Sequence, residues 1–196
     1  MSRILITVPT FENIAPETFK AIYDMRRGNH EVDFDFVRGY DCAKARNVAV
    51  RKATHGNYDY LMMIDSDTVP PNDALLNMLE YPTDIVLGCC PRKNTKKQEV
   101  VLYRFEDDNY NRMLTYPELP DTPRFPVRGG GAACMLIKMT VFRALSFPYF
   151  KFVIYDNADT LSEDLYFCSH ARNAGKTLEA DTRVRCGHIM KHIEYS

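Results

Sequence analysis

The sequence lacks several features that would place it in other classes of protein. Its 25 basic and 26 acidic residues nearly cancel, so it lacks the basic excess that unaided nucleic-acid binding needs. No apolar run approaches the roughly 20 residues of a membrane-spanning helix, and residues 4–6 are too short a run for a signal-peptide core. We therefore expect a soluble, cytoplasmic protein with no transmembrane segment.

The chain also lacks a C-x-x-C pair, although it contains six cysteines. Without such a pair or a secretory signal, free and mostly buried thiols are expected rather than a disulfide framework. The neighbours Cys89 and Cys90 invite a redox or metal interpretation, but a thiol at the end of an apolar strand is more typical of packing.

What is present is the pattern of an open α/β sheet. At 196 residues and 45% hydrophobic content, the chain has the size and composition of one domain with its own core. Buried strands are predicted from β-branched apolar runs, and a half-exposed strand from the alternation of apolar and acidic residues. Strand, helix, strand, helix and strand then follow one another at residues 3–8, 16–27, 31–37, 42–54 and 58–64. This order predicts a mostly parallel central sheet flanked by helices.

Regular patterns fade between residues 91 and 125, where the sequence is polar and rich in proline and tyrosine. Only a short strand near residues 100–105 is predicted there, so this stretch is expected to be irregular and to be mobile or to face a substrate. Other predicted strands lie at residues 85–89, 135–137, 177–180 and 184–186, and helices at 72–79, from 140, and at 162–174.

An acidic turn, Asp65-Ser66-Asp67, follows the apolar strand at residues 58–64. Ligands of open α/β sheets bind outside the carboxyl ends of the strands, where this turn is expected. Two carboxylates about 4 Å apart would repel by roughly 4 kcal/mol at an effective dielectric near 20, and a divalent cation would compensate. Oxygen ligands suit Mg²⁺ or Mn²⁺. The turn alone leaves open a purely structural alternative, in which both aspartates only cap the chain before Pro70.

Five blocks together resemble the GT-A glycosyltransferases of family 2. Their order and spacing match over nearly the whole chain, at residues 40–50, 60–67, 129–133, 162–167 and 186–188. The resemblance implies one GT-A, Rossmann-like domain over residues 1–196, with the irregular region 91–125 on the acceptor side. It also implies sugar transfer from a nucleotide-sugar donor, with UDP as the expected nucleotide.

The resemblance implies a metal site that contains Mn²⁺ or Mg²⁺. Asp67 would hold the cation against the donor diphosphate, while Asp65 would lie beside the ribose or a metal-bound water and complete the acidic side. His188 matches the late histidine that supplies a further metal ligand in many members. An ordinary histidine at a strand end is the alternative for His188.

An acidic pair, Glu163 and Asp164, opens a predicted helix, where the helix dipole favours carboxylates. Thr160 and Glu163 have the T-x-x-E spacing of a capping box, so Glu163 has a structural alternative. In inverting members of the family the aspartate of this pair takes the proton of the acceptor hydroxyl. The resemblance thus implies Asp164 as general base, with Glu163 as the alternate.

Further residues are expected around the donor. Arg46 and Asn47 begin the helix before the acidic strand, and an arginine there could pair with the diphosphate, or could equally be a solvated helix residue. Arg92 and Lys93 could help to bind phosphate or the acceptor, although they are more typical of a solvated basic loop. By the resemblance, three residues that end the first strand line the nucleoside pocket, and two glycines lie beneath the donor sugar: Thr7, Pro9, Thr10, Gly130 and Gly131.

The expected function is metal-dependent glycosyl transfer to an acceptor hydroxyl, with inversion implied by the Asp164 match. A nucleotidyltransferase would need a Gly-rich, basic loop after the first strand, and Pro9-Thr10-Phe11-Glu12 provides none. A nucleotide-sugar-binding module without turnover is the other alternative, which the intact acidic residues disfavour. The acceptor stays open among a saccharide, a lipid-linked glycan, a protein and a modified nucleic-acid base.

Overall fold

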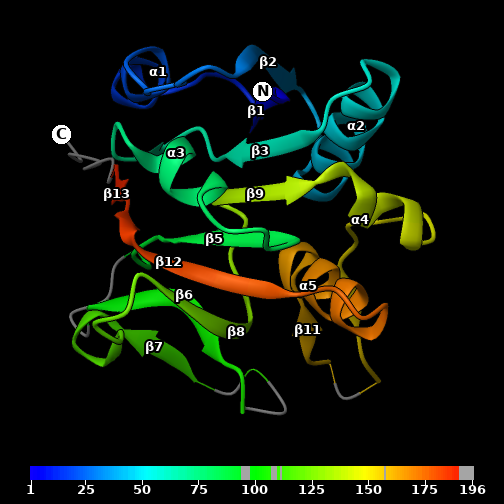
Figure 1. Cartoon of the computed structure of the whole chain (residues 1–196). Helices are drawn as coiled ribbons and strands as arrows, with labels where there is room; N and C mark the ends of the chain where they lie inside the picture. Colours follow the sequence, from blue (N-terminus) through cyan, green and yellow to red (C-terminus); the bar gives the residue numbers. More distant parts are fainter. Residues whose placement is uncertain (94–97, 107–109, 111, 157, 190–196) are drawn as a thin grey trace, which may run out of the picture.

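A large mixed sheet forms the centre of the computed structural model, which describes residues 1–93, 98–106, 110, 112–156 and 158–189 (Figure 1). The first half of the chain supplies three strands of the sheet's parallel part, the short strand β4 and three helices. These are β1 (Arg3–Thr10), α1 (Pro16–Tyr23), β2 (Glu31–Arg38), α2 (Cys42–His55), β3 (Tyr60–Ile64), β4 (Thr68–Val69) and α3 (Ala74–Leu79).

The second half of the chain completes the sheet and adds two more helices. Its elements are β5 (Ile85–Cys89), β6 (Glu99–Arg104), β7 (Met113–Thr115), a 3-10 turn η1 (Tyr116–Glu118), β8 (Arg124–Gly130), β9 (Cys134–Lys138), α4 (Met139–Ala144), β10 (Val153–Ile154), β11 (Thr160–Leu161), α5 (Glu163–Asn173), β12 (Leu178–Arg185) and β13 (Gly187–His188). Within the described ranges, no helix is both long and apolar enough to span a membrane.

The central sheet has nine strands in the order β2-β1-β3-β9-β5-β12-β8-β6-β7. Three neighbouring pairs are parallel, β1 with β2, β1 with β3 and β5 with β12, and the others are antiparallel. Strands β1, β2, β3, β5, β6 and β12 share one direction, and β7, β8 and β9 oppose it. The predicted α/β class with a central sheet and flanking helices is confirmed, and the sheet is mixed because three strands are reversed.

The region from residue 91 to 125 is more regular than its sequence indicates. Strands β6 and β7 form one edge of the sheet, and β6 occupies nearly the range in which a short strand is predicted. The side chains of Val100 and Leu102 are fully buried, so this edge belongs to the core. The strand predicted near residues 100–105 is present as β6, whereas β7 was not predicted, because three residues carry no clear periodicity.

Alternate residues of the central strands pack on opposite faces of the sheet. On β3, Leu61 and Met63 join the cluster that α2, α4 and α5 cover, whereas Met62 and Ile64 join the cluster under α1 and α3. This two-residue period is the pleat of a strand that is buried on both faces. Both layers are therefore hydrophobic, and polar side chains are concentrated at the strand ends.

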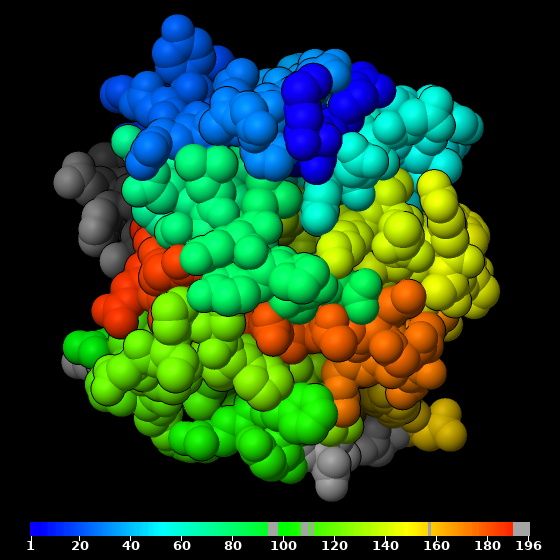
Figure 2. Space-filling model, viewed as in Figure 1, coloured from blue at the N-terminus to red at the C-terminus, as the bar shows by residue number. Residues whose placement is uncertain are grey.

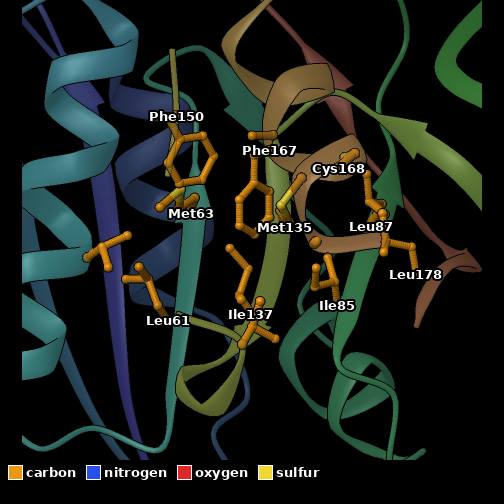
Figure 3. Close-up of a cluster of buried hydrophobic side chains, with 14 of the residues drawn as sticks. Leu61, Met63, Ile85, Leu87, Met135, Ile137, Phe150, Phe167, Cys168 and Leu178 are labelled. Carbon is orange, nitrogen blue, oxygen red and sulfur yellow. The ribbon is translucent and has the colours of Figure 1, made fainter. Parts of the chain in front are cut away.

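Stacked aromatic rings anchor α5 in the first cluster. The rings of Phe150 and Phe167 stack with centroids 4.5 Å apart, and Figure 3 shows them beside Met63 and Met135. Five of the six cysteines are buried, Cys42 is exposed, and all are free thiols, as expected. In the space-filling view the N-terminal part forms one end of the molecule and the segment with β6 and β7 the opposite end (Figure 2).

The fold brings one set of chain segments to a single edge of the sheet. Strands β1, β3, β5 and β12 all end there, and the reversed strand β9 begins there because Ile64 pairs with Cys134. The segments that follow these strands carry Asp65, Asp67, Lys93 and His188. This edge therefore collects the residues from which a site can be built.

Candidate active site

Asp67 and His188 meet at the carboxyl edge of the sheet. The imidazole Nε2 of His188 lies 3.3 Å from Asp67 Oδ1, and its Nδ1 lies 2.8 Å from the carbonyl oxygen of Pro91, to which an Nδ1–H donates. The ammonium group of Lys93 pairs with the other oxygen of Asp67. Because the carbonyl of Pro91 holds a proton on Nδ1, the imidazole donates to Asp67 only when Nε2 is protonated too, and a neutral ring would offer the lone pair of Nε2 to a cation instead.

The backbone holds this pair together across the length of the chain. Strand β13 pairs antiparallel with β4, which places His188 opposite Thr68, and the backbone N–H of Ile189 donates to the carbonyl of Asp67 at 2.9 Å. The hydrogen bond with His188, with help from Lys93, lowers the pKa of Asp67 to about 2 against the effect of burial. The same bond raises the pKa of His188. The pair is thus electrostatically coupled.

Arg46 forms a second charged group below the acidic turn. Its Nη2 lies 2.9 Å from Asp65 Oδ1 and its Nε lies 3.2 Å from Glu163 Oε1, while Nη1 is 3.4 Å from the carbonyl oxygen of Ala132. The arginine side chain is only 3% exposed. Desolvation would lower the pKa of Arg46, but Asp65 and Glu163 outweigh it and raise that pKa. Arg46 therefore links the turn after β3 to the start of α5.

The burial of Arg46 shows that its interpretation as a solvated helix residue is wrong. Its guanidinium faces Asp65, Glu163 and the carbonyl of Ala132, and a direct contact with a diphosphate stays a prediction. The capping box considered for Thr160 and Glu163 does not form. Helix α5 begins after the N-cap residue Ser162, and Thr160 belongs to β11. Desolvation raises the pKa of Glu163, with Arg46 opposing the rise.

Asp164 differs from its neighbour in exposure and in partners. Its side chain is half-buried, and Oδ1 accepts from the hydroxyl of Ser162 and from the backbone N–H of Leu165 at 2.8 Å. Its other oxygen, Oδ2, would lie 3.7 Å from a Cβ placed on Gly131. One oxygen therefore orients the carboxylate, and the other has no hydrogen-bond partner among the described residues.

A pocket of about 460 Å³ opens beside the acidic turn. Of the predicted residues, Pro9, Thr10, Asp65, Ser66 and Asp67 line it. Sequence reasoning missed the rest of the lining, which is aromatic, acidic or a thiol: Phe11, Tyr40, Asp41, Cys42 and Phe152. Phe11 and Phe152 are exposed aromatic residues next to chain turns, and that unusual exposure is visible only in the fold.

Two residues predicted for this pocket lie elsewhere. Thr7 is fully buried within β1, and its Oγ1 has no hydrogen-bond partner among the described residues. Asn47 faces the chain after α4: its amide donates to the carbonyl of Phe150 at 2.7 Å, and its Oδ1 accepts from the backbone N–H groups of Tyr149 and Phe150. Asn47 therefore tethers that segment to α2, because its side chain binds three backbone groups of the segment at once.

The glycines serve close packing between strands. A Cβ on Gly130 would lie 2.5 Å from the carbonyl oxygen of Val101 and 2.9 Å from Leu87 Cδ2, which no side chain could accommodate. Gly131 is also buried, and its N–H donates to the carbonyl of Val101 at 2.9 Å. The N–H of Gly131, predicted as a free donor beneath a donor sugar, is therefore already used by β6.

The predicted three-residue metal set is only partly assembled. Among the residues that the structure describes, no group of three or more His, Cys, Asp or Glu side chains could hold an ion. Asp67 and His188 lie together, whereas Asp65 is bound by Arg46. Ligands of an octahedral ion at about 2.1 Å are about 3 Å apart, so the spacing of Asp67 and His188 fits two adjacent positions.

Comparison with known proteins identifies the class that this fold and edge define. One similar solved structure is that of A197 from STIV, with a TM-score of 0.67 and 19% identity, covering 96% of this chain and 86% of that chain. The catalytic domain of Drosophila beta1,4galactosyltransferase 7, solved with xylobiose, has a TM-score of 0.58 and 18% identity over 97% of this chain and 72% of that chain. The fold is that of the GT-A glycosyltransferases.

The family follows from the sequence itself. The family model for glycosyl transferase family 2 matches residues 34–146, which is more than half of the chain, so the protein belongs to that family and is a glycosyltransferase. GalNAc-T7, solved with UDP, GalNAc and Mn²⁺, shares the fold with a TM-score of 0.63 and 12% identity over 97% of this chain and 44% of that chain. No curated protein matches the sequence.

Proposed function

We propose that this glycosyltransferase uses a divalent cation to transfer a sugar from a UDP-linked donor to an acceptor hydroxyl, with inversion at the anomeric carbon. The arrangement of Asp67 and His188 carries the proposal. Their facing atoms are 3.3 Å apart, and the carbonyl of Pro91 orients the imidazole from its far side. A backbone carbonyl on the second nitrogen is the usual support of a metal-binding histidine.

Asp67 and His188 would hold Mn²⁺ or Mg²⁺, and the donor diphosphate and water would complete the coordination. Bound there, the cation would neutralise charge that develops on the leaving nucleoside diphosphate. Lys93 already lies at the same carboxylate, so its ammonium would be available to the diphosphate as well. Mn²⁺ and UDP are present in the structure of GalNAc-T7, which supports this choice of cation and donor.

The pocket beside the acidic turn is the proposed nucleoside site. Its volume of about 460 Å³ is within the range of small-ligand pockets. The rings of Phe11, Tyr40 and Phe152 provide flat apolar surface for a base, and Asp65 provides an acceptor for ribose hydroxyls. Arg46 would position Asp65 for that task, acting through the carboxylate instead of touching the donor.

Asp164 is the proposed general base. Its Oδ1 is held by Ser162 and the N–H of Leu165, which leaves Oδ2 to take the proton of the acceptor hydroxyl as that oxygen attacks the sugar. Glu163 is the weaker candidate because it is buried and bound to Arg46. The acceptor class stays open, and a nuclear magnetic resonance assignment of the product anomer tests inversion.

Calorimetric titration of UDP, with and without Mn²⁺, tests the proposal. We expect Mn²⁺ to strengthen UDP binding in the wild type, and Asp67→Asn to abolish that gain. Asp41→Asn is the matched control, because it removes a charge from the same pocket while asparagine still caps α2. UDP binding that is indifferent to Mn²⁺, or equal responses of the two variants, would overturn the metal role. Donor hydrolysis separates an enzyme from a binding module without turnover.

A further inference from the structure

A second pocket, of about 390 Å³, lies along α2 on the side away from the acidic turn. One wall is a stripe of the helix at helical spacing, and the other is the chain that follows α4, which Figure 1 shows beside α2. Its principal lining residues are Lys44, Val48, Arg51, His55, Phe147 and Tyr149. It shares no lining residue with the proposed nucleoside pocket.

The pocket gathers basic side chains without acidic ones. Lys44, Arg51 and His55 line it, and none of its lining residues is Asp or Glu. Arg51 and His55 form no ion pair with any residue that the structure describes, whereas the adjacent Lys52 pairs with Asp35 on β2. The helix thus pairs one of its neighbouring cations and leaves the other facing the pocket, where an anion would be attracted.

The opposite wall is aromatic and held in place. Phe147 is 72% exposed, and its ring meets that of Tyr149 edge to face with centroids 5.9 Å apart. Asn47 accepts hydrogen bonds from the backbone N–H groups of Tyr149 and Phe150, so this wall is tied to the helix that carries the cations. The exposed ring of Phe147 therefore provides apolar surface that a ligand in this pocket would cover.

We propose that this pocket binds a phosphate ester of an apolar or aromatic group. Arg51 would contact the phosphate, since a guanidinium can bind two phosphate oxygens at once. The ammonium of Lys44 lies 4.2 Å from the centroid of the Tyr40 ring, beside the nucleoside pocket, and is not assigned to the phosphate. Phe147, Tyr149 and Val48 would cover the apolar part of the ligand. The site is separate from the donor pocket and does not depend on the proposed transfer reaction.

Calorimetric titration of the wild-type chain with three probes tests the site: inorganic phosphate, 1-naphthyl phosphate and farnesyl phosphate. Both esters should bind at least about tenfold more tightly than inorganic phosphate, because each adds apolar area to bury. Tighter binding of the naphthyl ester indicates a small aromatic ligand, and tighter binding of the farnesyl ester indicates a lipid phosphate. Esters no tighter than phosphate would overturn the apolar contact.

Three variants locate the binding. Arg51→Met should weaken both esters about tenfold, as loss of a charged hydrogen bond does, and Phe147→Ala should weaken the esters but not inorganic phosphate. Lys52→Met is the matched control, with the same charge change one residue along α2. Equal losses of ester affinity in Arg51→Met and Lys52→Met would show that only the overall charge of the protein matters. Displacement of the esters by UDP with Mn²⁺ would place them in the donor pocket. Either result would refute the site. Because all three changed side chains are exposed, the variants should fold, which circular dichroism checks.

Discussion

The two aspartates of the acidic turn are equally exposed, yet their surroundings differ. The side chains of Asp65 and Asp67 are 33% and 34% exposed. Asp65 is bound by the buried guanidinium of Arg46, which Glu163 shares, whereas Asp67 is bound by the partly exposed Lys93 and by His188. Asp65 is thus held by a buried partner, whereas Asp67 has partners that a ligand would be able to replace.

The difference lies in the partners, because removing a partner costs most where the remaining charge cannot be solvated. Breaking a buried ion pair from one side costs about 3–5 kcal/mol, whereas exposed pairs contribute about 0–1 kcal/mol. We therefore expect the group around Arg46 to control stability and the group around Asp67 to control ligand binding. Four experiments test that division.

Arg46→Met should have the largest effect. It leaves Asp65 and Glu163 without their shared cation, and we expect the free energy of unfolding to fall by about 3–5 kcal/mol. Urea unfolding followed by circular dichroism measures it. Arg51→Met is the control, because the same substitution at an exposed site of the same helix should change stability by less than about 0.5 kcal/mol. Similar losses in both variants would contradict the division.

Asp67→Asn should act in the opposite way. We expect stability within about 1 kcal/mol of the wild type but Mn²⁺ affinity reduced about 100-fold, since the proposed site would lose a direct ligand. Titration of Mn²⁺ followed by electron paramagnetic resonance measures the affinity. An unfolding free energy that falls as far as in Arg46→Met would show that Asp67 is structural.

Glu163→Gln should change how stability depends on pH. Burial raises the pKa of Glu163 above its ordinary value of 4.5, so its contribution to stability is fully present below about pH 4.5 and is lost as pH rises through the raised pKa. The wild type should therefore lose stability relative to Glu163→Gln over that interval. Urea unfolding at a series of pH values measures the difference. Glu17→Gln, at an exposed position, is the control. If the difference in unfolding free energy between the wild type and Glu163→Gln were the same at every pH, the raised pKa of Glu163 would not contribute to stability.

Lys93→Met should have the smallest effect. Its ammonium competes for the carboxylate of Asp67, so removing it should tighten Mn²⁺ binding by up to about fivefold in the absence of nucleotide, equivalent to about 1 kcal/mol. Arg92→Met is the matched control, because Arg92 pairs with Glu99. If both variants change Mn²⁺ affinity equally, the local competition is excluded in favour of a general charge effect.

Much of the fold could be predicted because it depends on local patterns. The buried strands β1, β3 and β5 are continuous apolar runs, and α2 and α5 have helical spacing, so their positions follow from periodicity. The reversed direction of β9 could not be predicted, since its sequence is equally apolar and direction depends on the connection around it. Strand β7 was missed because three residues carry no period.

The site was predicted where a residue lies at a strand end, and missed where its role depends on a neighbour. Asp67 and His188 follow β3 and β12, so the topology alone brings them to one edge. The burial of Arg46 and the tether formed by Asn47 depend on α5 and on the chain after α4, far away in sequence. No local signal in the sequence reports such partners.

The residues that match the family model include only part of the proposed site. The matched residues 34–146 contain Asp65 and Asp67, whereas Asp164 and His188 lie beyond them. The assignment to the family therefore rests on residues that include the acidic turn but neither Asp164 nor His188. The proposed base and the second proposed metal ligand depend on where the fold places the last helix and the last strands.

The short ladder between β4 and β13 has a consequence for synthesis on the ribosome. It joins Thr68 to His188, so the proposed cation site is closed by nearly the last residues that the structure describes. During translation, the acidic turn emerges long before its histidine. Because β12 joins β5 to β8 and directly precedes β13, the middle of the sheet and the proposed cation site would be completed almost together, and cation binding would report that synthesis had passed both strands.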